Sequence, residues 1–164
     1  MKKMLTLLSF LLILASCSNI TNNEVEVYFC PADYCQGEIL KELVKAHESI
    51  YFLTYSFTDQ KIASLLVEKS ESIIVEGVIE RQRITSKYNV YNYLKAAGID
   101  VVPDNNDALM HDKIFIIDEK TVVTGSYNPT QNGNENNNEN VVIIHDKRIA
   151  KMYKQEFLKI KNLQ

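Results

Sequence analysis

The sequence lacks several features that would assign it to a particular class of protein. It has no internal repeat, and no block of like charge is long enough to suggest a disordered interaction tail. The formal net charge is −3, which argues against capture of nucleic acid over the whole surface but not against a local basic cleft. What remains is a chain of 164 residues, 46% hydrophobic and 24% charged, with the size and balance of one globular domain.

The first 17 residues differ from the rest. Lys2 and Lys3 precede an apolar run over residues 5–15, which is too short to cross a bilayer as a stable helix and ends in Leu-Ala-Ser-Cys. This pattern is typical of a secretory signal and resembles a bacterial lipobox, in which the cysteine, here Cys17, receives diacylglycerol and becomes the new N-terminus. We predict a lipoprotein signal peptide over residues 1–16. A plain signal peptide with an incidental cysteine and an uncleaved anchor are the alternatives.

The predicted anchor implies where the protein works. Residues 17–23 are polar after the cysteine and would form a lipid-anchored tether to a domain over residues 24–164. The protein would then sit at the cell envelope after secretion. Ser18 stands where an Asp would signal retention in the inner membrane, so the outer membrane is favoured in a Gram-negative cell.

Two cysteines remain once Cys17 is lipidated. Cys30 and Cys35 form an even pair in an oxidising compartment, which allows a disulfide, with two separate buried thiols as the alternative. The pair has no second Cys or His pair at finger spacing, so a zinc site is not expected. Asp107 and Asp112 belong to no recognisable acidic cluster. We therefore expect neither a metal nor a cofactor.

Strand and helix patterns alternate along the domain and predict one α/β domain, in which a mixed β-sheet is sandwiched between helices. The long apolar strands indicate a sheet buried on both faces. Residues 131–140, QNGNENNNEN, are expected to form a loop. The predicted strands cover residues 25–29, 50–55, 73–79, 100–102, 113–117, 121–124 and 141–144, and the predicted helices lie around residues 39–44, 62–66, 90–94 and 149–157.

One segment carries the chemistry. His111 and Lys113 are two residues apart in a predicted strand, so an imidazole and an ammonium leave one face together and make a site for an anion. Gly125 ends the returning strand, where a glycine permits close approach of the backbone. Ser126 and Asn128 add a hydroxyl and an amide at the same end of the hairpin. Together these groups can bind a tetrahedral oxyanion and attack it.

The segment HDKIFIIDEKTVVTGSYN, residues 111–128, resembles the His-x-Lys-x4-Asp-x6-Gly-Ser-x-Asn motif of the phospholipase D superfamily, the HKD motif. YSFTD at 55–59 and the ENVVII run at 139–144 look like their counterparts in small bacterial single-motif endonucleases and in the mitochondrial cardiolipin hydrolase group. The resemblance covers roughly residues 24–158 and implies the phospholipase D/nuclease fold. Glu80 is a departure, because relatives often carry Asp after the third strand.

The resemblance implies catalytic roles for six residues. His111 would be the nucleophile and would form a phosphohistidine intermediate. Lys113 and Asn128 would hold the non-bridging oxygens of the phosphate, and Ser126 would orient or bond it. Asp118 would position and balance the cationic cluster.

Glu139 matches a family acid that hydrogen-bonds the nucleophilic histidine and fixes its tautomer. A second histidine would act as general acid and then as general base. His47 and His145 lie in no comparable context. The family solution is a homodimer whose two-fold axis brings two copies of His111 into one site.

The sequence therefore predicts a metal-independent phosphodiesterase. DNA or RNA is the first choice of substrate, because the nearest resemblance is to short endonucleases. A phospholipid is the alternative, since a lipid-anchored enzyme already sits beside head groups. An inactive scaffold that binds anionic polymers or lipids is a third reading.

Overall fold

The computed structural model describes residues 24–163. The predicted signal peptide over residues 1–16, the predicted lipidation site at Cys17 and the tether to residue 23 lie outside the described residues. Within residues 24–163, no helix is both long and apolar enough to cross a membrane.

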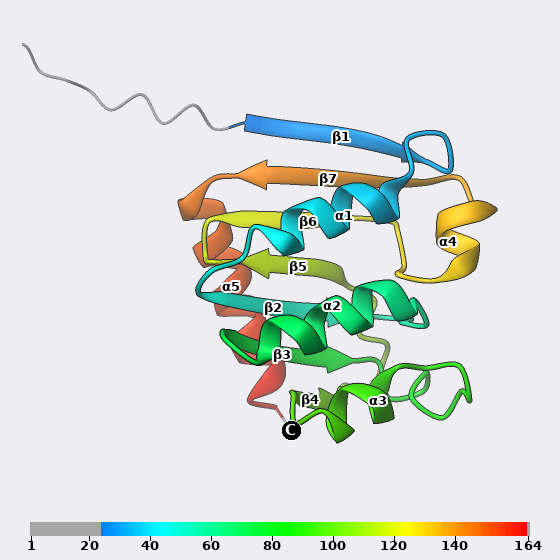
Figure 1. Cartoon of the computed structure of the whole chain (residues 1–164). Helices are drawn as coiled ribbons and strands as arrows, with labels where there is room; N and C mark the ends of the chain where they lie inside the picture. Colours follow the sequence, from blue (N-terminus) through cyan, green and yellow to red (C-terminus); the bar gives the residue numbers. More distant parts are fainter. Residues whose placement is uncertain (1–23, 164) are drawn as a thin grey trace, which may run out of the picture.

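Seven strands form one mixed sheet in the order β1-β7-β6-β5-β2-β3-β4 (Figure 1). Strands β2, β3 and β4 run parallel, and the remaining pairs are antiparallel. The strands are β1 Glu24–Cys30, β2 Ser49–Thr54, β3 Ile74–Ile79, β4 Asp100–Pro103, β5 Lys113–Ile117, β6 Thr121–Gly125 and β7 Glu139–His145, and the helices are α1 Cys35–Val44, α2 Gln60–Ser70, α3 Tyr91–Ala96, α4 Gln131–Glu135 and α5 Lys147–Lys161.

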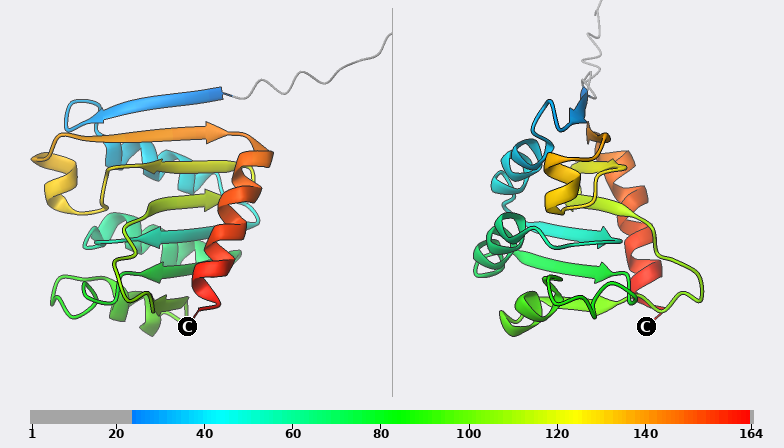
Figure 2. Two further views of the ribbon diagram at one scale, coloured as in Figure 1. Left: turned by 180° about the vertical axis from the view of Figure 1, so that it is seen from behind. Right: turned by 90° about the vertical axis from the view of Figure 1, so that its right-hand side faces the viewer.

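Helices cover both faces of the sheet, which confirms the predicted fold class. Helices α1, α2 and α3 lie on one face and α5 crosses the other (Figure 2). The central strands β2 and β5 are buried at every position, because they are covered on both sides. Strand β1 is at the edge, and its exposure alternates along most of its length: Val25, Val27 and Phe29 are exposed on the α5 side.

The Asn-rich segment is more ordered than expected. Residues 131–135 form the short helix α4, which begins after Thr130, whose hydroxyl oxygen accepts a hydrogen bond from the Gly133 N–H at 3.0 Å. A hydroxyl at this position satisfies a backbone donor that a helix start leaves unpaired. The following strand begins at Glu139 rather than at Val141.

The sheet has two ends with different contents. The His111 end holds the start of β5 and the end of β6, and there β1 ends with Cys30 opposite Glu139. The Asp118 end holds the β5–β6 turn, and there β1 begins with Glu24 opposite His145. Glu24, the first residue that the structure describes, therefore lies at the end of the sheet remote from His111 (Figure 1).

A disulfide joins Cys30 to Cys35, whose Cα atoms lie 5.6 Å apart. The bond links the last residue of β1 to the first residue of α1. Both sulfur-bearing side chains are buried. The edge strand is thereby attached covalently to the helix layer at the His111 end.

Candidate active site

The β5–β6 hairpin brings the two halves of the motif segment together. Strand β5 starts at Lys113, two residues after His111, and β6 ends at Gly125, directly before Ser126. Gly125 has a φ of 144°, and a Cβ built there would lie 2.3 Å from the carbonyl oxygen of Asn140. Only glycine allows β6 and β7 to approach so closely at this point.

His111 is exposed to solvent, and its ring packs on Tyr55 with the two ring centres 4.4 Å apart. The backbone N–H of Tyr55 donates to the Asp112 carbonyl at 2.9 Å, which ties the end of β2 to the strand that carries the motif. Arg83 lies over the Tyr55 ring, 4.5 Å from its centre, and donates to the Tyr55 hydroxyl. Tyr55 and Arg83 thus belong to the site, although neither was assigned a catalytic role from the sequence.

Lys113 is nearly buried, with 9% of its surface exposed. Its ammonium donates to the carbonyl oxygen of His111 at 2.6 Å and lies 5.1 Å from the centre of the Tyr55 ring. Burial lowers the pKa of Lys113, and the negative charges of Asp112 and Glu139 oppose this effect. A cation withdrawn from water interacts more strongly with a phosphate oxygen that enters its surroundings.

Asn128 is oriented by the backbone of a neighbouring strand end. Its side-chain oxygen accepts from the Ser56 N–H at 3.3 Å, which leaves the amide nitrogen as the group available to an anion. Ser56 follows Tyr55 directly, so one short segment contacts His111 and holds Asn128. Tyr55 and Ser56 therefore link His111, Lys113 and Asn128 at this end of the sheet.

Ser126 and Glu139 interact with each other. The Ser126 hydroxyl donates to the Glu139 carboxylate at 2.5 Å and accepts from the Asn140 N–H at 3.0 Å. The other oxygen of Glu139 accepts from the Asn137 amide at 2.9 Å. Among the described residues no hydrogen bond joins Glu139 to His111, so the expected contact is replaced by one that holds Ser126.

Asp118 is placed differently from the sequence expectation. It lies in the β5–β6 turn, at the far end of the hairpin from His111, and its carboxylate accepts from the backbone N–H groups of His47, Glu48 and Ser49 at 2.8–3.1 Å. Burial opposes ionisation, but these three donors prevail and lower the pKa of Asp118. Asp118 therefore does not balance the cationic cluster. It fastens the turn to the start of β2.

A pair of buried carboxyl groups supports the loop that leads to His111. Glu80, which is fully buried, accepts from the Met110 N–H at 2.8 Å, and Asp104, which is 3% exposed, accepts from the Asn106 N–H at 2.8 Å. Burial raises the pKa of Asp104, and the neighbouring Glu80 adds to the effect. Glu80, which stands where relatives often carry Asp, thus helps to hold the loop that leads to His111.

A groove of about 760 Å³ opens beside Asn128 at the His111 end. It lies between the β2–α2 loop, the β3–α3 loop and the α4 region. Its lining residues carry hydroxyl or amide groups, apart from one lysine, and none is aliphatic or acidic. A second cavity, of about 320 Å³, lies next to His111 against the end of α5. Within residues 24–163, no group of three or more His, Cys, Asp or Glu side chains is arranged to hold a metal ion.

Comparison with known proteins decides the family. Residues 39–161 match the family model described as cardiolipin synthase, PLD-like domain. The chain belongs to the phospholipase D superfamily. The resemblance seen in residues 111–128 is thereby confirmed, and the protein is a phosphodiesterase of this superfamily.

Three similar proteins show how far the likeness extends. A protein named phospholipase D from Rickettsia conorii is 34% identical over 142 residues, which are 86% of this chain and 71% of that protein. A mitochondrial cardiolipin hydrolase from Xenopus tropicalis is 29% identical over 78% of this chain and 63% of its own length. The crystal structure of Nuc, a phospholipase D family member from Salmonella typhimurium, has a TM-score of 0.81 at 30% identity and covers 85% of this chain and 95% of Nuc.

Proposed function

We propose that this phospholipase D superfamily member is a nuclease that hydrolyses DNA or RNA through a phosphohistidine on His111. The observation that carries the proposal is the joint position of three groups at one end of the sheet. An exposed imidazole, a desolvated ammonium and an oriented amide lie at this end, on His111, Lys113 and Asn128, and Asn128 also lines a polar groove. Such a set can attack a phosphodiester and stabilise its added negative charge.

The reaction proceeds in two displacements. The His111 imidazole attacks phosphorus, the bond to the leaving oxygen breaks, and a second imidazole gives that oxygen its proton. The same imidazole then takes a proton from water, the resulting hydroxide attacks phosphorus, and the bond to His111 breaks. Lys113 and Asn128 hold the non-bridging oxygens in both steps.

The second imidazole is supplied by a second copy of the chain. Of the chain's three histidines, His47 lies next to Asp118 and His145 pairs with Glu26 and Thr121, both at the Asp118 end. Neither can reach a phosphate held beside His111. A two-fold axis near His111 brings its own copy into the site.

Exposed apolar side chains lie beside the nucleophile and suit such an interface. Leu109 and Leu163 line the cavity next to His111 and are 44% and 62% exposed, and Met152 is 59% exposed beside Asp112. Exposed apolar side chains are common at sites of association.

Mixing His111→Asn chains with wild-type chains tests the shared site. After subunit exchange, activity should fall as the square of the wild-type fraction, because a heterodimer has only one of the two imidazoles. A linear fall would mean that each chain works alone.

The groove favours nucleic acid over phospholipid. Its lining offers hydrogen bonds and one positive charge, which suit sugars, bases and phosphates, whereas the aliphatic side chains near His111 line the separate cavity against α5. Glu24, the first described residue, lies at the end of the sheet remote from His111. A phospholipid remains the second candidate because of the lipid anchor proposed below.

A substrate panel separates the candidates. The purified full chain should hydrolyse bis-p-nitrophenyl phosphate and plasmid or oligonucleotide, and it should release little head group from phosphatidyl vesicles. Faster release of head groups than cleavage of nucleic acid would favour the phospholipase. Binding of nucleic acid without turnover of any diester would favour the inactive scaffold.

Metal independence is part of the proposal, since nucleophile, acid and phosphate clamps are all side chains of the protein. Activity should persist in EDTA. Loss in chelator with recovery on adding Mg²⁺ or Zn²⁺ would overturn this point.

The protein is proposed to reach the cell envelope as a lipoprotein anchored at Cys17, on the outer membrane in a Gram-negative cell. The support is the Leu-Ala-Ser-Cys sequence after a basic and apolar leader. Cys17→Ser should abolish lipid attachment and partitioning into detergent. Unchanged partitioning of the variant would show that the sequence is incidental.

A further inference from the structure

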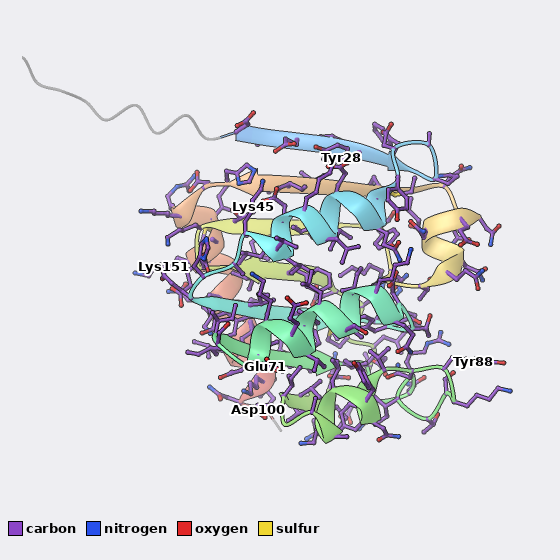
Figure 3. All side chains as sticks on the ribbon, in the orientation of Figure 1. Tyr28, Lys45, Glu71, Tyr88, Asp100 and Lys151 are labelled. Carbon is purple, nitrogen blue, oxygen red and sulfur yellow. A yellow bond between two sulfur atoms is a disulfide. The ribbon has the colours of Figure 1, made fainter. Side chains whose placement is uncertain are left out.

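The polar groove has a second feature that the two displacement steps do not use. Tyr88 lines it from the β3–α3 loop and is 65% exposed, the largest exposure among the large hydrophobic side chains that the structure describes. Figure 3 shows Tyr88 reaching outward at the His111 end, while the labelled Lys151 lies at the opposite end of the sheet. The Lys87 ammonium lies 4.7 Å from the centre of the Tyr88 ring.

The exposed face of the Tyr88 ring is apolar, and covering it with a bound group would remove that surface from water. Here the ring stands at the rim of a groove that begins at Asn128, which holds the phosphate in the proposed reaction. A nucleobase has an apolar π-face that stacks on such a ring, and a lysine beside it can meet the next phosphate.

The opposite wall of the groove supplies hydrogen bonds. Asn132 and Asn137, from the α4 region, face the loop that carries Tyr88 across the groove and belong to its lining. Both side chains can donate and accept, so they can bind base edges or sugar hydroxyls. No Asp or Glu lines the groove, and Lys87 is its one charged lining residue.

We propose that this groove binds a single-stranded nucleotide flanking the scissile phosphate, with its base stacked on Tyr88 and its phosphate near Lys87. The inference rests on the proposed nuclease activity and deepens it by naming the substrate class. A single strand offers free base faces, whereas in a duplex both faces of each base are covered by its neighbours. The enzyme should therefore prefer single-stranded DNA or RNA to the same sequence in a duplex.

The test compares three tyrosine variants of the full chain on three substrates. Tyr88→Ala removes the stacking ring, and Tyr88→Phe keeps it. Tyr93→Ala is the matched control, because Tyr93 is also an exposed tyrosine, 43% exposed, but lies on α3 and does not line the groove. The substrates are a labelled single-stranded 12-mer, as DNA and as RNA, the same strand annealed to its complement, and bis-p-nitrophenyl phosphate, which has no flanking nucleotide.

Tyr88→Ala should raise KM for the single-stranded 12-mer by about tenfold, the effect of losing one stacked base, with little change in kcat. Tyr88→Phe and Tyr93→Ala should match wild type. Turnover of bis-p-nitrophenyl phosphate by Tyr88→Ala should stay near wild type. An unchanged KM for the 12-mer, an equal loss on the small diester, or equal cleavage of duplex and single strand would overturn the inference.

Binding to an inactive chain separates this inference from the proposed function. In a His111→Asn background, fluorescence anisotropy of the labelled 12-mer should show about tenfold weaker binding when Tyr88→Ala is added. If wild type turns over no diester yet this loss is seen, the nuclease proposal fails and the groove assignment stands. If turnover is normal and the loss is absent, only the groove assignment fails.

Discussion

The two ends of the β5–β6 hairpin carry parts of one sequence motif, but their polar side chains differ in hydrogen bonding and exposure. At the Asp118 end the carboxylate is saturated by three backbone N–H groups. At the His111 end the imidazole is exposed and has no hydrogen-bond partner among residues 24–163. Satisfied groups stabilise a fold, whereas open groups remain available to a substrate. The motif therefore contains a structural residue, Asp118, and a reactive residue, His111, at opposite ends of one strand.

Among the variants that test this contrast, His111→Asn should show the largest effect, a loss of turnover. Turnover of bis-p-nitrophenyl phosphate should fall by at least about a thousandfold, because the nucleophile is lost. The free energy of unfolding should change by less than about 0.5 kcal/mol, because the side chain is exposed and makes no hydrogen bond within residues 24–163. Denaturant titration beside the activity assay measures both. Wild-type rates in the purified variant would contradict the assignment of His111 as the nucleophile.

Asp118→Ala should show the reverse pattern. Loss of a carboxylate that accepts three backbone hydrogen bonds should lower the free energy of unfolding by about 3 kcal/mol, since the N–H groups lose a charged acceptor. The folded protein should keep turnover within about threefold of wild type at low temperature. Lys120→Ala is the matched control in the same turn and should leave the free energy of unfolding nearly unchanged, because its ion pair with Glu48 is exposed. A large loss of turnover in folded Asp118→Ala protein would show that Asp118 takes part in catalysis.

The smallest expected effect is on how the free energy of unfolding changes with pH, because Asp118 and Asp104 should contribute with opposite signs. The pKa of Asp118 is lowered in the folded protein, so its contribution to stability is present above the unfolded pKa, about 3.9, and is lost as pH falls through the folded value. The pKa of Asp104 is raised, so its contribution is present below about 3.9 and is lost as pH rises through the folded value.

Unfolding titrations of Asp118→Asn and Asp104→Asn between pH 3 and pH 8 measure this difference. Relative to wild type, Asp118→Asn should lose stability as pH rises from 3 to 7, and Asp104→Asn should gain on the order of 1 kcal/mol over the same range. Changes of the same sign in both variants would contradict the assignment of opposite pKa shifts.

The sequence predicted most of the fold because hydrophobic periodicity marks buried strands and helices directly. Helix α4 was missed because residues 131–135 have no apolar period and depend on the Thr130 cap. Residues 111–128 predicted the β5–β6 hairpin, which places His111 and Ser126 at the same end of the sheet. The place of Asp118 could not be predicted, because its partners His47–Ser49 are 69–71 residues away in sequence.

Tyr55 and Arg83 show the same limit. Tyr55 contacts His111 and Arg83 contacts Tyr55, and both contacts depend on how β2 and the β3–α3 loop meet the hairpin, which no local pattern encodes. The partner of Glu139 was also set by tertiary packing, since Ser126 approaches it across β6 and β7. Local patterns identify the groups, and long-range packing decides which of them touch.

The central claim is that His111 attacks phosphorus before water does, and the stereochemistry at phosphorus tests it most directly. A chiral phosphorothioate diester of a dinucleotide, cleaved by the full chain in water enriched in ¹⁸O, reports how many displacements occur. Two in-line displacements through a phosphohistidine each invert the centre, so the account predicts overall retention of configuration. Overall inversion would mean that water attacks the diester directly and would contradict the account.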